Sequence, residues 1–445
     1  MSLLDTTTEA ADDLSPEALP PRPLAHHLAL TVYWLSNTLL WGALFHQALQ
    51  VRLAGWFGEA NIGYYFGILG FAGGIIGTGT QIVIGAFSDR SLHPRGRRRP
   101  FIAAGSLLGA GALLAFGASR TYWPFAGALM LVQLFTNTAL GPFTALLPDT
   151  VNPNEHGKAS GFMGVARLLG DTGGLILAGY LLSLGPLQHA PHAVQLAFFD
   201  RRMFVLCALM AGFIVVTMLY TCLVIQERPL KRRPESSTWR IIRNSFDVDV
   251  RGNPDFFWLS VSRAITNLGF YMFLETLLLF IMYTLKDPDP ARTNMLVMLP
   301  AIAAAVLSSI PSGILSDRVG RRRLIFVAQF LMATGATGFA FAPNLNVAYI
   351  AGLPAGLAYG VFTAVEWALA CNLLPKGDAA RYLGIWNASA VVPQIIGFLV
   401  AGAVGSAISA RVPGLGWRVD FGIAAACCLI GAYFLRFVRE RRNVR

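Results

Sequence analysis

Four ionisable residues lie inside long apolar runs of this sequence, where a charge is costly and is usually retained for a function. Arg167 and Asp171 are four positions apart, so on a helix they share one face and can pair. We interpret Arg167 as a hydrogen-bond donor to a hydroxyl or carboxylate of a bound ligand, and Asp171 as an acceptor that can take up a proton. The alternative is a self-neutralising structural pair.

The other two ionisable residues are glutamates. Glu275 lies in NLGFYMFLETLLLF and Glu366 lies in TAVEWALACNLLP. Because a dry, low-dielectric cavity favours the neutral form of a carboxyl group, each can bind a proton and release it when water gains access. These two residues and Asp171 are therefore the candidates for proton coupling. For Glu275 the alternative is an ion pair with Lys286 or Arg292.

Neutral polar residues near the middle of the apolar runs extend this set. Amides and a phenol beside tryptophans offer many directional hydrogen bonds without requiring a charged ligand, which suits a polyhydroxylated molecule. The alternative is that these groups hydrogen-bond neighbouring helices to each other. The candidates for ligand binding are Arg167 together with Asn37, Gln133, Asn137, Asn267, Tyr271, Asn387 and Gln394.

The elements that must position these residues are membrane-spanning helices. Of the 445 residues, 55% are hydrophobic and 13% are charged, whereas a soluble protein has about a quarter charged residues. Apolar runs long enough to cross a bilayer recur along the chain. We predict an all-α membrane protein with twelve transmembrane helices, at 29–50, 61–87, 100–119, 122–147, 158–184, 203–226, 257–284, 294–316, 323–342, 346–373, 381–407 and 418–438.

The charge distribution predicts the orientation of these spans. With both termini in the cytoplasm, the cytoplasmic segments contain 25 of the 35 Lys and Arg residues, the outer loops contain 8, and Arg167 and Arg263 lie inside spans. Under the positive-inside rule this split favours cytoplasmic termini. We expect a multi-pass protein of the plasma (inner) membrane. The same split explains the net charge of +11 better than nucleic-acid binding does.

An internal repeat divides the chain. GAFSDR begins at Gly85 and GILSDR begins at Gly313, 228 positions later, while ALLPD is echoed by NLLPK after 227 positions. Two pseudo-symmetric halves suit alternating access to a site held between them. The predicted parts are a disordered cytoplasmic tail at 1–28, a six-helix half at 29–226, a cytoplasmic linker at 227–256, a second six-helix half at 257–438 and a basic cytoplasmic tail at 439–445.

The repeated loop has the pattern GxxSDR followed by GRRR, between spans two and three and again between spans eight and nine. This pattern resembles the signature of the major facilitator superfamily, and the resemblance implies the major facilitator fold. It also implies a network that latches the cytoplasmic side, in which carboxylates pair with arginines and helix ends, and glycines allow close helix approach. The residues of this gating motif are Gly85, Asp89, Arg90, Gly96, Arg97, Arg98, Gly313, Asp317, Arg318, Gly320, Arg321 and Arg322.

Longer stretches narrow the resemblance. SDRSLHPRGRRRPFIAAG, GPFTALLPD, FMGVARLLG and LGIWNASAVVPQ resemble the sucrose:proton symporters of plants and, more widely, the glycoside–pentoside–hexuronide:cation symporters. The resemblance implies proton-coupled symport of a sugar or glycoside, with sodium as the alternative coupling ion. The plant carriers have an Asp near Gln133, an Arg at Thr144, and neutral or aromatic residues at Arg167 and Asp171. The resemblance thus implies a sucrose-like disaccharide as the substrate class, but sucrose itself and the coupling site do not transfer automatically.

Other classes of function are less consistent with the sequence. It contains no catalytic motif, and its five cysteines lie in apolar runs without metal-ligand spacing, so we expect no enzyme, metal or cofactor. An exporter or antiporter is disfavoured because ARLLGDTGG lacks the Pro of the antiporter run in span five. A sensor or scaffold would carry a larger soluble domain. The expected partners are a small molecule, a coupling ion and the bilayer, with no nucleic acid, and we expect a monomer.

Overall fold

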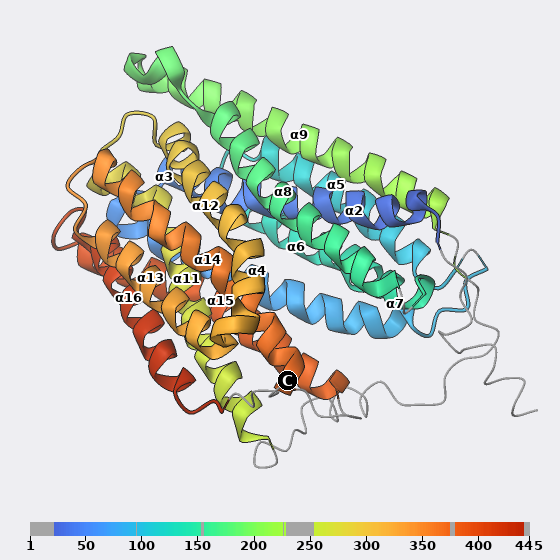
Figure 1. Ribbon diagram of the computed structural model, residues 1–445. Helices are drawn as coiled ribbons and strands as arrows, with labels where there is room; N and C mark the ends of the chain where they lie inside the picture. Colours follow the sequence, from blue (N-terminus) through green and yellow to red (C-terminus); the bar gives the residue numbers. More distant parts are fainter. Residues whose placement is uncertain are drawn as a thin grey trace, which may run out of the picture. The chain divides into compact units, whose positions relative to one another are not determined.

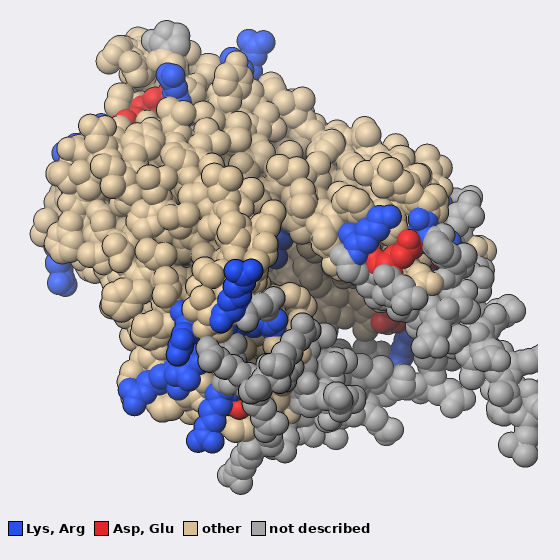
Figure 2. All heavy atoms as spheres, viewed as in Figure 1, with Lys and Arg blue, Asp and Glu red and all other residues tan. Residues whose placement is uncertain are grey.

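The computed structural model describes residues 22–94, 96–152, 155–225, 227, 253–373 and 379–439. In this part of the chain twelve helices are long and apolar enough to cross a membrane, and strands are absent, so the predicted all-α fold with twelve spans is confirmed. Most of the face drawn in Figure 2 carries no charged side chain. Such a surface suits contact with lipid rather than with water.

Within the described residues, the first six spans and their connections contain ten helical elements (Figure 1). Span one combines α2, η2 and α3, and span four combines α6 and α7. The elements are α2 (Leu24–Ala43), the π-helix η2 (Leu44–Ala48), α3 (Leu49–Ala54), α4 (Glu59–Ser88), α5 (Arg99–Ala118), α6 (Tyr122–Thr144), α7 (Leu146–Thr150), α8 (His156–Leu182), the 3₁₀ helix η4 (Gly185–His189) and α9 (His192–Val224).

The last six spans are more regular. Their elements are α11 (Pro254–Leu279), the π-helix η5 (Phe280–Thr284), α12 (Pro290–Val319), α13 (Arg321–Ala340), α14 (Leu345–Leu373), α15 (Ala379–Ser409) and α16 (Leu415–Leu435). Spans one and seven, which correspond in the repeat, thus both contain a π-helix near the predicted outer end. A π-helix is rare and is often found at a functional site, and nothing in the sequence pattern predicted these two.

The predicted start of span six is wrong. We placed it at 203, after Asp200, Arg201 and Arg202, whereas α9 begins at His192. The polar residues do not end the helix, because Asp200 forms an ion pair of 2.7 Å with Arg120 and Arg201 is exposed. Arg201 and Arg202 therefore belong to the helix and not to an outer loop.

Contacts group the chain into two compact units. One unit contains Met1–Ala43, Gly73–Leu175 and Asp200–Glu235, and the other contains Leu44–Ala72, Ile176–Phe199 and Ser236–Arg445. The second unit therefore includes the predicted outer ends of several of the first six spans together with the last six. The expected tails and linker fall mostly on residues 1–21, 228–252 and 440–445, which lie outside the described part of the chain.

Small residues bring helices into close contact inside each unit. In the first unit a Cβ atom at Gly174 would collide with the carbonyl oxygen of Leu39, so α8 packs directly on α2. In the second unit a Cβ at Gly360 would collide with the carbonyl oxygen of Ala305, so α14 packs on α12. Close backbone packing is the usual source of helix association in lipid, where burial of apolar surface gives little driving force.

Candidate functional site

A buried ion pair lies within the last six spans. Arg263 of α11 points its Nε atom toward Oε2 of Glu366 on α14, at 3.6 Å. The guanidinium of Arg263 also lies 3.8 Å from the centre of the Trp386 ring on α15. Three helices thus supply one cation, one carboxylate and one aromatic face.

The pair is enclosed but not sealed. Glu366 is 4% exposed and Trp386 is buried, whereas the Arg263 side chain is 16% exposed. Oε1 of Glu366 has no hydrogen-bond partner among the described residues. At 3.6 Å the contact is longer than a good charge-assisted hydrogen bond. Glu366 can therefore exchange its ion pair for a proton without losing a close hydrogen bond.

The sequence analysis missed the partner of Glu366. Arg263 was noted only as a cation inside a span, because it lies 103 positions from Glu366 and no local spacing connects them. The available signal was the scarcity of such groups, since an intramembrane cation needs an anionic or aromatic neighbour. The structure thus places Glu366 beside a cation and an aromatic ring.

Glu275 lies near the predicted outer end of α11. Its Oε1 atom is 3.8 Å from Nδ1 of His46, which belongs to η2, and Glu275 is only 2% exposed. The backbone carbonyl of His46 accepts a hydrogen bond of 3.1 Å from the Asn294 amide on α12. The titratable group that the structure places beside Glu275 is thus a histidine of span one, whereas the alternative supposed Lys286 or Arg292.

Arg167 and Asp171 both lie on the exposed side of α8. The opposite side of this helix packs on α2, where a Cβ at Gly170 would collide with the Thr38 hydroxyl. The backbone of Asp171 is itself in contact with Gly42. The two charged residues therefore share a helix face that is not buried within their unit, and they remain candidates for ligand and proton binding.

Two of the three candidate amides of the first unit are connected to each other. Asn137 of α6 donates to the Gln133 side chain at 3.1 Å and accepts from Gln81 of α4 at 2.5 Å. On α2, Asn37 accepts from the Trp41 indole N–H at 3.1 Å. Gln133, Asn137 and Asn37 are all buried. The bond from Gln81 to Asn137 links α4 to α6, whereas the Gln133–Asn137 and Trp41–Asn37 bonds lie within single helices, and all three residues remain candidates for ligand binding.

The four ligand-binding candidates of the last six spans differ in their contacts and in their exposure. Asn267 donates a long hydrogen bond of 3.4 Å to the Ser389 carbonyl, and Tyr271 packs beside Gly397. Asn387 is exposed and Gln394 is half-buried. Of the four, Asn267 alone lines the small pocket described next.

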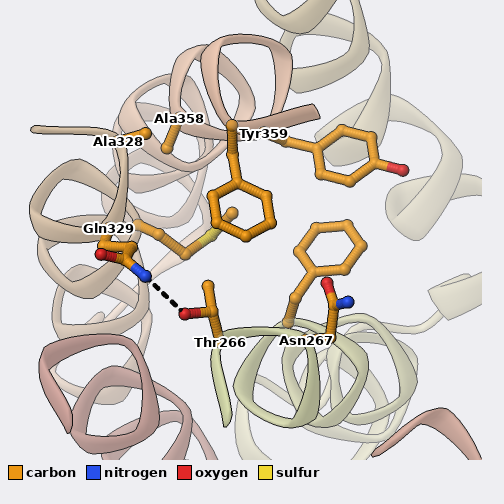
Figure 3. A pocket seen from close by; sticks show the side chains of 9 residues that line it. Thr266, Asn267, Ala328, Gln329, Ala358 and Tyr359 are labelled. Carbon is orange, nitrogen blue, oxygen red and sulfur yellow. Dashed lines mark hydrogen bonds between the residues drawn. The ribbon is translucent and has the colours of Figure 1, made fainter. Parts of the chain in front are cut away.

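A small pocket lies between α11, α13 and α14 (Figure 3). Its wall includes Phe270 and Tyr359, whose rings stack 4.3 Å apart at 4°. Gln329 of α13 is fully buried and donates to the hydroxyls of Thr266 at 2.8 Å and Ser262 at 3.0 Å. Gln329 and Tyr359 were not among the predicted residues, although an amide within span nine was visible in the sequence.

The gating motif of the first unit forms a charged network. Arg98 contacts Asp89 at 2.8 Å and also pairs with Asp149 of α7, while Arg97 contacts Asp149 at 2.6 Å. The Arg98 backbone N–H donates to Glu227 at 2.8 Å. Burial raises the pKa of Glu227, and the nearby Arg98 opposes this rise. Asp149, in the ALLPD stretch, and Glu227 were not predicted as members of this network.

The second copy of the motif makes different contacts. Arg321 donates to the Ala368 carbonyl at 2.8 Å and Arg322 donates to the Arg436 carbonyl at 2.9 Å. Gly96 and Gly320 both have a positive φ, of 107° and 102°, which favours glycine at corresponding places of the repeat. The side chain of Asp317 lies outside the described part of the chain.

The glycines of the motif differ in their surroundings. A Cβ atom at Gly96 would collide with the Glu227 side chain, whereas one at Gly85 or Gly313 would meet nothing within 4 Å among the described residues. The other two motif cations lie at the ends of α4 and α12. Arg90 lies two positions beyond the last residue of α4, and Arg318 is the last residue but one of α12.

The described residues include no group of three His, Cys, Asp or Glu side chains that could hold a metal ion. Twelve apolar helices with a buried cation–carboxylate pair and a repeated charged loop define a polytopic membrane protein.

The chain belongs to the Major Facilitator Superfamily. The family profile matches residues 24–287 and 259–445, and the family predicted from the loop motif is confirmed. An uncharacterised MFS-type transporter of Methanocaldococcus jannaschii is 24% identical over 78% of this chain and 79% of its own length. The solved structure of a mutant of the nucleoside transporter NupG has a TM-score of 0.68 at 15% identity, covering 93% of this chain and all of that one.

Relatives named for sugars match shorter parts. The general alpha-glucoside permease of Schizosaccharomyces pombe is 26% identical over 51% of this chain and 41% of its own length. The sucrose transport protein SUC3 of Arabidopsis thaliana is 27% identical over 34% of this chain and 30% of its own length. The chain thus spans less than half of these two relatives.

Proposed function

We propose that this transporter is a proton-coupled symporter of a sugar or glycoside, working by alternating access between two six-helix halves with both termini in the cytoplasm. The observation that carries the coupling part is the buried pair of Arg263 and Glu366 beside Trp386. The sugar part is supported by the names of the partial relatives and by the amide and aromatic groups along α11 and α14.

The pair provides a simple coupling step. When Glu366 is ionised, it neutralises Arg263, and the two charges hold α11 and α14 together. When Glu366 takes up a proton, Arg263 is left as a cation with its aromatic neighbour and can donate hydrogen bonds to ligand hydroxyls. Ligand binding and protonation therefore favour each other, as linkage requires.

Glu275 with His46 is a second candidate proton site. Both groups can titrate, and they lie 3.8 Å apart between span one and span seven. The exposed residues Arg167 and Asp171 of α8 remain candidates for ligand and proton binding from the first unit. The neutralising substitutions E275Q, D171N and E366Q distinguish these candidates. Only the substitution at the coupling residue should make uptake independent of the pH gradient.

The test is uptake by the purified protein in proteoliposomes. A panel of disaccharides, monosaccharides, glycosides and nucleosides is offered under an imposed proton gradient, an imposed sodium gradient, or neither. Accumulation of a sugar or glycoside that depends on the proton gradient is expected. Accumulation driven by sodium would replace the coupling ion, and accumulation of nucleosides without sugars would overturn the substrate class.

The same liposomes test the direction of transport. An exporter or antiporter would drive the substrate against an inwardly directed proton gradient, whereas a symporter drives it with that gradient. Asp200→Asn is a suitable control, since it removes an acidic residue whose partner, Arg120, lies at the surface of the first unit. This variant should transport like the unmodified chain.

A further inference from the structure

Glu59 forms a contact that joins span two to the last six spans. It is the first residue of α4, and its Oε1 atom accepts a hydrogen bond of 2.7 Å from the Gly414 backbone N–H. The same oxygen accepts from the Trp417 indole N–H at 3.1 Å. Gly414 has a φ of 78° and immediately precedes α16. We call these contacts the Glu59 clasp.

Asp289 forms a matching contact in the opposite direction. It precedes α12, the second of the last six spans, and accepts from the Ser183 hydroxyl at 2.5 Å and from the Gly185 N–H at 3.2 Å. Its other oxygen accepts from the Leu184 N–H at 3.3 Å. Gly185 also has a positive φ, of 50°. We call these contacts the Asp289 clasp.

The two clasps are related by the internal repeat. Glu59 and Asp289 are 230 positions apart, and Gly185 and Gly414 are 229 apart, close to the 228 of the loop motif. In each clasp a carboxylate at the start of a second span binds the N–H of a positive-φ glycine between a fifth and a sixth span. Each clasp crosses from one series of six spans to the other, so the arrangement is reciprocal.

The seam between the clasps is tightly packed. A Cβ atom at Gly402 of α15 would collide with the Gly63 carbonyl of α4, and the Gly63 N–H donates to the Ser406 hydroxyl at 2.9 Å. The Gln47 amide donates to the Ala291 carbonyl at 2.9 Å. These contacts also join the first six spans to the last six between the two clasps.

We infer that Glu59 and Asp289 are the two positioning residues of a single gate at the predicted outer end, which opens only when both carboxylates release their glycine N–H groups. Charge-assisted hydrogen bonds to backbone N–H groups are strong yet can be exchanged for water, which suits a contact that must form and break in each cycle. This inference rests on membership of the transporter family and not on the proposed sugar or proton.

The alternative is that each carboxylate only caps its own loop. The two accounts differ in what they predict for the loop that carries no substitution. If the clasps form one gate, weakening the Glu59 clasp must also expose the Asp289 clasp, because both loops separate when the gate opens. If each is a local cap, only the loop that has lost its acceptor becomes exposed.

Hydrogen exchange followed by mass spectrometry on the full chain in nanodiscs measures this directly. Glu59→Gln is expected to speed exchange about tenfold in the segment 412–418, the scale of one lost charge-assisted bond. It should also speed exchange in the segment 183–187, which Glu59 does not touch. Asp289→Asn should have the mirror effect. Effects confined to the substituted clasp, or absent from both segments, would overturn the inference.

Two further variants guard against misfolding and non-specific loosening. Ser183→Ala removes only one hydrogen bond to Asp289 and keeps the helices intact, and it should still raise exchange in the segment 412–418. Asp200→Asn breaks the ion pair with Arg120, which lies within the first six spans. It should leave exchange in both segments unchanged, and an equal increase there would also count against the gate.

Discussion

Arg263 and Glu366 face each other from α11 and α14, with Nε and Oε2 separated by 3.6 Å. This contact joins opposite charges on two different membrane spans of the second unit. The first prediction concerns the cost of breaking it. Arg263→Gln should destabilise the protein by about 3 kcal/mol, because a buried carboxylate then lacks its cation. The double variant R263Q/E366Q should recover most of this loss in a thermal unfolding assay. A double variant as unstable as the single one would show that the charges do not interact.

The aromatic face beside Arg263 should matter less than the charge. Trp386→Phe keeps an aromatic ring but weakens the attraction to the guanidinium by about 1 kcal/mol, so the rate of uptake should fall a few-fold. Trp386→Ala should instead lower stability by about 3–5 kcal/mol, since Trp386 belongs to the buried core of its unit. The uptake rate reports the lost attraction to the guanidinium, and the thermal midpoint reports the lost core packing. An equal loss of stability in both variants would contradict this separation.

Helix packing makes a prediction for a pair of glycines. Gly360→Ala should lower the yield of folded protein, because the added methyl group collides with the Ala305 carbonyl and helices α14 and α12 must move apart. Gly313→Ala is the matched control, since its methyl group meets nothing within 4 Å. Size-exclusion profiles in detergent compare them, and a well-folded Gly360→Ala protein would show that the close approach is not needed.

The pKa of Glu227 predicts a pH dependence. Burial raises this pKa in the folded protein, so folding favours the protonated form. The resulting stability is fully present below the pKa of the unfolded chain and is lost as the pH rises through the folded pKa. Glu227→Gln should therefore flatten the decline of thermal stability with rising pH at mildly acidic values. An unchanged slope in this variant would assign the dependence to other groups.

The sequence was sufficient for the spans and the family because both depend on local patterns. Apolar length defined all twelve helices, and GxxSDR with GRRR identified the superfamily. The error at span six arose because Asp200, Arg201 and Arg202 resemble a helix boundary, although an ion pair with Arg120 and surface exposure let the helix continue.

Contacts between distant spans could not be predicted in the same way. Glu366 and Glu275 were found because a carboxylate in an apolar run is conspicuous. Their neighbours Arg263 and His46 depend on which helices pack together, and no spacing in one chain records that. Asp420 of α16 shows the limit further, since it is fully buried and accepts a long hydrogen bond of 3.4 Å from Thr276, yet it was not among the candidates.

The central claim is that Glu366 couples proton movement to transport. The most direct measurement is uptake of the substrate found in the panel by Glu366→Gln proteoliposomes, with and without a proton gradient. We predict that the variant still exchanges substrate across the membrane at equal concentrations but no longer accumulates it, and that its rate no longer varies with pH. Gradient-driven accumulation by Glu366→Gln equal to that of the unmodified protein would contradict the claim.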